Sequence, residues 1–135
     1  MIDRLVDQAI VSLLATISGL KVFAGAEDID PALETPFCAV HSEVTGMAGR
    51  KPIYNLLTRI EYNSIAGLDP MSATDPLMTQ IDSLIGPGAD YSSNPSVSAT
   101  GLGYLGWEAI GRSSQEWGDR RKNVRELQVK AQLSG

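Results

Sequence analysis

The chain's single cysteine and single histidine, Cys38 and His41, are the residues whose chemistry most resembles that of a catalytic pair. A thiol nucleophile needs a base within hydrogen-bond reach and a third group that orients the base. The apolar run from Phe37 to Val40 predicts a strand, and strand residues three positions apart point to opposite faces. We therefore expect no Cys–His pair. Cys38 is interpreted as a buried apolar residue and His41 as a solvent-facing or interfacial one.

A second candidate is the spacing Gly101-x-Gly103-x-x-Gly106, which matches the glycine pattern of dinucleotide-binding folds. In those folds the glycines follow a buried strand and open a helix that packs closely on the sheet. Residues 94–100 are too polar for a buried strand, and residues 107–112 do not open an amphipathic helix. We interpret the glycines as a flexible turn, with a small nucleotide-binding module as the alternative hypothesis.

Carboxylates gather between Gly25 and Pro36, and their spacing differs from the dense alternating ligands of a calcium loop. We predict an exposed acidic loop there, made by Glu27, Asp28, Asp30 and Glu34. With one histidine and one cysteine, the sequence predicts no catalytic residue, no metal and no cofactor, so we expect the protein not to be an enzyme.

The opposite charge gathers late in the chain, in a segment that also holds an isolated tryptophan. We predict a projecting loop over 111–123 and an interface with a subunit or another partner, with candidate residues Trp117, Arg120, Arg121, Lys122 and Arg125. A solvated turn is the first alternative, and a contact with phosphate is the second. Beside an acidic remainder, this cluster makes a polarised molecule that can dock head to tail with copies of itself.

Length and charge limit the other functions. The 135 residues fit one domain, and the net charge of −5 disfavours tight, nonspecific DNA binding. No stretch approaches 18 uninterrupted apolar residues, and Asp3, Arg4 and Asp7 interrupt the N-terminal apolar pattern. We therefore predict a protein that neither spans a membrane nor carries a secretion signal.

Hydrophobic spacing predicts an α+β fold, with an antiparallel or mixed sheet packed by an N-terminal amphipathic helix and a second short helix. The apolar stripe predicts the first helix over 2–17, and Asp75-Pro76 opens the second, which runs to Ile85. Alternation places Tyr54, Leu56, Thr58, Ile60 and Tyr62 on one face of a strand over 53–63. The other predicted strands cover 21–24, 37–44, 104–110 and 127–133, the last two forming a hairpin. The predicted loops lie at about 24–36, 86–103 and 111–123.

This order of elements resembles the tail terminator, or tail-completion, proteins of long-tailed bacteriophages. The resemblance rests on pattern, and its marks are the amphipathic helix, Lys21-Val-Phe, Pro36-Phe37, the alternating strand, the 75–85 helix, Trp107 and the closing strand from Arg125. It covers most of the chain without a unique signature residue. A head-completion or adaptor ring protein of the head–tail neck is the closest alternative.

The resemblance implies a structural virion protein, not a catalyst. Such a subunit assembles into a hexameric ring that caps the tail tube and meets the head-completion or connector protein. Its location would be the virion tail or neck, after assembly in the host cytoplasm. DNA would pass through the ring without specific binding, and the loop with Glu27, Asp28, Asp30 and Glu34 would then face the lumen.

Overall fold

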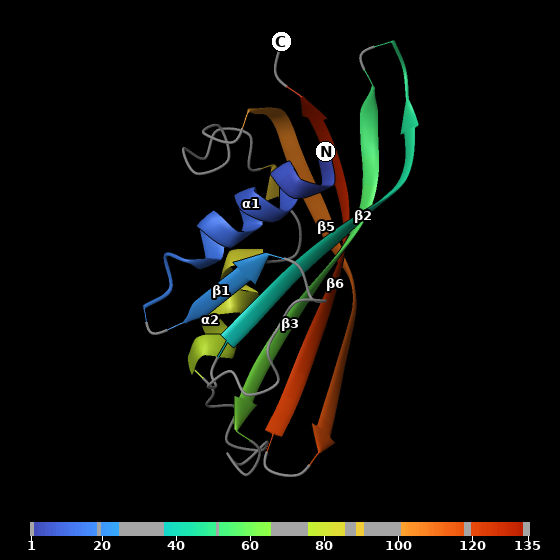
Figure 1. Cartoon of the computed structure of the whole chain (residues 1–135). Coiled ribbons are helices and arrows are strands. Elements are labelled where there is room, and N and C mark those ends of the chain that lie inside the picture. The colour runs from blue at the N-terminus through green and yellow to red at the C-terminus, as the bar shows by residue number, and fades with distance from the viewer. Residues whose placement is uncertain are drawn as a thin grey trace.

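The computed structural model describes residues 2–18, 20–24, 37–50, 52–65, 76–85, 89–90, 101–117 and 120–133 (Figure 1). Its elements are two helices and one six-stranded sheet. This is the α+β fold that the hydrophobic spacing predicts. No helix within these ranges is long and apolar enough to cross a membrane.

Helix α1 spans Ile2–Leu14 and buries its apolar stripe in the core. It ends three residues before the predicted end, because the Thr16 hydroxyl donates to the Leu13 carbonyl at 2.7 Å and a turn follows. Side-chain hydrogen bonds of this kind compete with the continuing helix ladder. Ile17 nevertheless stays buried, so the predicted stripe holds beyond the last helical turn.

The strands are β1 (Lys21–Ala24), β2 (Phe37–Ala48), β3 (Ile53–Ile65), β4 (Ala89–Asp90), β5 (Leu102–Trp117) and β6 (Arg120–Leu133). Their order across the sheet is β1-β2-β3-β6-β5-β4. All neighbouring strands are antiparallel except β1 and β2, so the sheet is mixed. The β2–β3 and β5–β6 hairpins reach toward opposite ends of the molecule (Figure 1).

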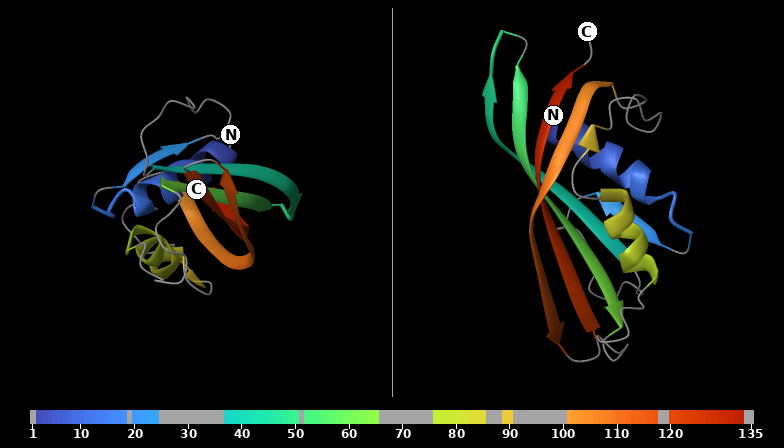
Figure 2. Two further views of the ribbon diagram at one scale, coloured as in Figure 1. Left: turned by 90° about the horizontal axis from the view of Figure 1, so that it is seen from below. Right: turned by 180° about the vertical axis from the view of Figure 1, so that it is seen from behind.

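Both helices lie on one face of the sheet, and the opposite face carries no helix (Figure 2). The face under the helices includes the predicted row on β3, where Leu56, Thr58, Ile60 and Tyr62 are buried and Tyr54 is half-buried. The predicted hairpin of 104–110 and 127–133 also forms, with Trp107 opposite Val129. Burial of each large apolar side chain in this layer contributes about 1.5–3 kcal/mol.

Helix α2 spans Pro76–Ile85 and is tied to the sheet at its C-terminal end. The buried Trp107 indole donates a 2.8 Å hydrogen bond to the Ile85 carbonyl. The last carbonyls of a helix have no partner within the helix, so this bond satisfies one of them. The indole therefore fixes where α2 ends against β5.

The predicted loop over 111–123 is wrong. Residues up to Trp117 continue β5, residues from Arg120 begin β6, and the two strands stay paired to the hairpin end. Residues 111–115 in this part of the hairpin are polar and exposed, so they lack the apolar alternation that reveals a half-buried strand. The predicted 86–103 loop likewise contains β4 and the start of β5, and residues 25–36 and 91–100 lie outside the described ranges.

Candidate assembly surfaces

The outer strand β2 is covered over one half only. Its first four residues, Phe37–Val40, pair with β1 on one side and β3 on the other. From His41 to Ala48, β3 is the only neighbouring strand that the described residues supply. We call this segment the open β2 edge. The backbone N–H and C=O groups on the outer side of such a segment can pair with a strand of another chain.

The outer strand β5 repeats this arrangement on the other side of the sheet. The two residues of β4 cover Gly106 and Trp107, and between Glu108 and Trp117 the described residues supply only β6 as a neighbour. We call residues 108–117 the open β5 edge. Because β2 and β5 run in opposite directions, the two open edges lie at opposite ends of the sheet.

Apolar side chains are exposed at both open edges. Val44 is 42% exposed and Met47 is 66% exposed on β2, and Ile110 is 52% exposed on β5. Each open edge also contains an irregularity in its register, between Val44 and Gly46 on β2 and between Ala109 and Gly111 on β5. Such bulges are common at sheet edges and alter where the following side chains point.

A cleft of about 520 Å³ flanks the open β5 edge on the helix-covered face. It separates the end of α2 from the hairpin, and its walls are Asp82, Ile85, Ala109, Ile110, Gly111, Arg112 and Arg125. Apolar groups and two guanidinium groups therefore border the same space. The cleft is accessible beside strand backbone for which the described residues supply no outer neighbour.

Arg125, a predicted interface residue, makes a close contact within the chain. Its Nε and Nη2 atoms donate to the two carboxylate oxygens of Asp82 at 2.9 and 3.2 Å. The Arg125 side chain is only 12% exposed, so this two-point ion pair connects α2 to β6 at the cleft. Its role toward a partner stays a prediction, and little of its surface is left for such a contact.

The other predicted interface residues gather at the end of the β5–β6 hairpin. Trp117 and Arg120 are partners in the strand register, and Arg121 and Lys122 follow on β6. The Lys122 ammonium lies 3.5 Å from the Glu61 carboxylate, which also approaches Arg59 at 3.6 Å. The structure thus places these four residues at one end of the sheet, and their contact with a partner stays a prediction.

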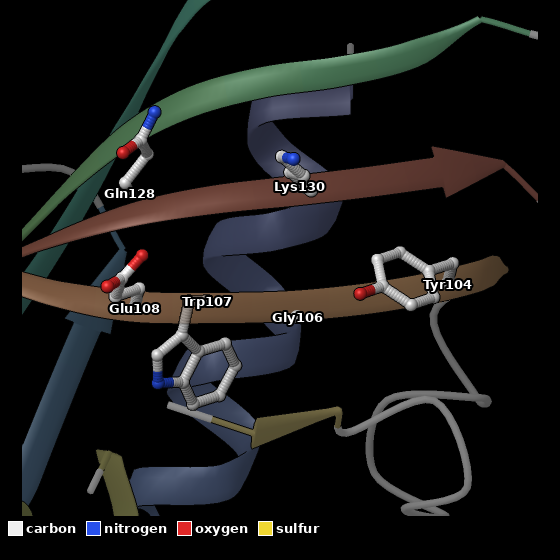
Figure 3. Close-up of a pocket in the computed structure, with 6 residues that line it drawn as sticks. All are labelled: Tyr104, Gly106, Trp107, Glu108, Gln128 and Lys130. Carbon is white, nitrogen blue, oxygen red and sulfur yellow. The ribbon is translucent and has the colours of Figure 1, made fainter. Parts of the chain in front are cut away.

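The face without helices has a shallow hollow of about 370 Å³ over β5 and β6 (Figure 3). It opens because Gly106 has no side chain opposite Lys130, while Tyr104 and Glu108 stand on either side. Gln128 completes the polar lining, and the Trp107 indole points to the helix-covered face. The hollow is open to solvent, so it offers little enclosure to a small ligand.

A buried polar cluster joins α1 to the middle of the sheet. Asp7 is 7% exposed, and its Oδ1 atom has no hydrogen-bond partner among the described residues. Burial raises the pKa of Asp7 to about 6, although hydrogen bonds from Ser42 and the nearby His41 act in the lowering direction. The buried hydroxyls of Ser42 and Thr58 lie 2.7 Å apart.

The arrangement of these groups does not assemble a nucleophile. Cys38 is fully buried, and burial raises the pKa of its thiol to about 12, which favours the unreactive protonated form. Cys38 pairs with Tyr62 under the helices, and His41 is exposed opposite Arg59 on the other face. The described residues contain no group of three metal-ligating side chains that could hold an ion.

The glycine pattern has a different context from a nucleotide-binding turn. Gly101, with a φ of 88°, precedes β5, and Gly103 and Gly106 lie within that strand, which continues to Trp117. No helix N-terminus follows the glycines to bind a pyrophosphate. Glu27, Asp28, Asp30 and Glu34 lie outside the described residues.

Sequence reasoning missed the open edges and the polar cluster. An open edge has no sequence signature of its own, because it depends on how far β1 and β4 extend beside their neighbours. A signal for Asp7 was present, because positions 7, 10 and 14 share one side of a helix and the last two are apolar. Comparisons with protein-family models and with curated proteins find no match to the chain.

Proposed function

We propose that this chain is a structural ring subunit of a virion, a tail terminator that caps the tail tube of a long-tailed phage and joins it to the head connector. The observation that carries the proposal is the pair of half-covered outer strands at opposite ends of one sheet. A chain with one open edge on each side can bind a copy of itself on each side. Repetition of one such contact generates a ring when the rotation closes.

Further support comes from the order of elements on which the resemblance rests. The N-terminal helix, the Lys21–Ala24 strand, the strand from Phe37, the alternating strand, the short helix and the closing strand all form. A head-completion or adaptor ring would use the same features. Both roles require an assembling subunit and no chemistry.

Light scattering coupled to size-exclusion chromatography, over a concentration series, tests the proposal. A hexameric ring of the 14.4 kDa chain has a mass of about 86 kDa, and negative-stain images of that fraction should contain rings with a central hole. Binding of the rings to the ends of purified tail tubes would identify the terminator role. A chain that forms no closed ring, alone or on tail tubes, contradicts the proposal.

A further inference from the structure

We propose that the open β2 edge of one copy adds, as an antiparallel strand, to the open β5 edge of the next copy, in a register that places Val44 opposite Arg112 and Met47 opposite Ala109. This inference rests on the proposed function and specifies the contact from which the ring would be built. Strand addition at a sheet edge is a recurrent mode of protein recognition.

The lengths of the two open edges favour this contact, which we call the β2–β5 joint. The open β2 edge begins after Val40, where β1 ends, and runs for eight residues to the turn at Gly49. The open β5 edge begins after Trp107, where β4 ends, and its first eight residues reach Gln115. In the proposed register His41 opposes Gln115 and Ala48 opposes Glu108. The next β5 residue would meet Val40, whose outer side is occupied by Ala24.

The side chains that would meet in the joint lie on the same face of the sheet. Val44 shares a face with the buried Ser42, and Met47 pairs with Tyr54, which packs on the core under the helices. On β5, Ala109 pairs with the buried Leu127, and Arg112 pairs with Arg125, which forms the ion pair with Asp82 of α2. All four proposed contact residues therefore lie on the helix-covered face of their own sheets. A copy placed alongside with the same face forward continues the antiparallel order of the sheet.

The bulges also match. Two residues, Thr45 and Gly46, separate Val44 from Met47, and two residues, Ile110 and Gly111, separate Arg112 from Ala109. The register irregularities of the two open edges fall within these intervals. In the proposed register the two irregular segments face each other, so regular strand lies on both sides of them. Met47 would then approach the cleft beside Ala109, Ile110 and Ile85.

Pairing of one open edge with the same edge of another copy would join fewer residues than the β2–β5 joint, when the bulges are again placed opposite each other. Two β2 edges would overlap from Glu43 to Ala48, six residues, before reaching the turn at Gly49. Two β5 edges would overlap from Glu108 to Ser113, also six residues, before reaching Trp107, which β4 covers. The β2–β5 joint gains two residue pairs, and no like charges oppose each other in it: Glu43 meets Ser113, Glu108 meets Ala48 and Arg112 meets Val44.

A charge swap tests the joint. Val44→Lys places a lysine opposite Arg112, so we expect association, measured by light scattering over a concentration series, to weaken by about tenfold or more. Adding Arg112→Glu to the same chain should restore association to within about threefold of wild type, because the pair becomes attractive. Ile53→Lys is the matched control, since Ile53 is 43% exposed on the same hairpin but lies on the interior strand β3.

Cysteine pairing tests the joint independently of affinity. A mixture of Val44→Cys and Arg112→Cys chains should form a mixed disulfide dimer under mild oxidation, while Val44→Cys mixed with Gln128→Cys should not. Gln128 is exposed on an interior strand, and the native Cys38, which every variant retains, is fully buried in the wild-type fold. A disulfide formed only within one variant, Val44→Cys or Arg112→Cys alone, would indicate self-pairing of one edge and overturn the proposal.

The joint and the ring can fail separately. Rings that form equally well with Val44→Lys would overturn the joint and leave the ring function standing. Open chains of copies that lose association with Val44→Lys and regain it with Arg112→Glu would support the joint and contradict the ring. A wild-type chain that is monomeric at every concentration, together with no mixed disulfide between the Val44→Cys and Arg112→Cys chains, overturns the joint.

Discussion

The two halves of β2 differ in burial although they form one continuous strand. Phe37–Val40 is buried throughout and has a strand on either side, whereas Glu43–Ala48 is exposed or half-exposed. Val40 and Val44 show the contrast between identical residues, because the first is fully buried and the second is 42% exposed. The hydrophobic effect stabilises a fold through the apolar surface that folding removes from water, so the first half of β2 contributes to stability. The second half keeps its surface exposed and available for contact with other chains.

The same division runs through β5. Leu105 and Trp107 are buried near the covered start of the strand, and residues from Glu108 to Gln115 are exposed. In both strands the change from buried to exposed falls close to the point where the short outer strand stops. The core therefore ends before the strands do, and backbone pairing carries the hairpins beyond it.

The largest effect should come from truncating a core residue of β3 and comparing it with an exposed residue of the same type and strand. Ile60 is fully buried and Ile53 is 43% exposed. Ile60→Ala should lower the free energy of unfolding by about 3–4 kcal/mol through lost burial and a residual cavity, and Ile53→Ala by less than about 1 kcal/mol. Denaturant unfolding followed by circular dichroism measures both. Equal losses would contradict the division.

The core half was largely predictable, because burial on one side of an element leaves a period in the sequence. The α1 stripe from Ile2 and the β3 row from Leu56 to Tyr62 both follow from spacing alone. The end of the β5–β6 hairpin was missed since Ser113, Ser114 and Gln115 are exposed, and a strand that is polar on both faces has no such period. Its pairing is visible only in three dimensions.

Contacts between distant segments were equally hidden. The ion pair of Asp82 with Arg125 joins residues 43 positions apart, and its geometry depends on where α2 crosses β6. The cluster of Asp7, Ser42 and Thr58 combines three elements. In the sequence, each of these residues looks like any other polar residue. Only the fold decides which of them lose contact with water.

An intermediate effect, opposite in sign, should come from Asp7→Asn inside the core region. The pKa of Asp7 rises from its ordinary 3.8 to about 6, which corresponds to about 3 kcal/mol. Since the folded state prefers the protonated form, this group's favourable contribution is present below pH 3.8 and is lost as the pH rises to about 6. Asp7→Asn should therefore raise the free energy of unfolding by up to about 3 kcal/mol at pH 7.

The pH dependence separates this effect from a simple packing change. The gain of Asp7→Asn over wild type should shrink steadily between pH 6 and pH 4, as the wild-type carboxyl takes up its proton. Denaturant unfolding at a series of pH values gives this difference directly. Asp3 and His41, which also influence Asp7, are unchanged in both proteins. A gain that is constant over this range would contradict the role of charge burial.

The smallest effect on folding should come from the open half of β2. Met47 is 66% exposed, so Met47→Ala removes few buried contacts and should change the free energy of unfolding of the monomer by less than about 0.5 kcal/mol. Denaturant unfolding at a low protein concentration measures this value without a contribution from association. A loss approaching that of Ile60→Ala would place Met47 in the folding core. The end of β2 would then no longer be an exposed surface separate from the folding core, and the contrast between the two halves would fail.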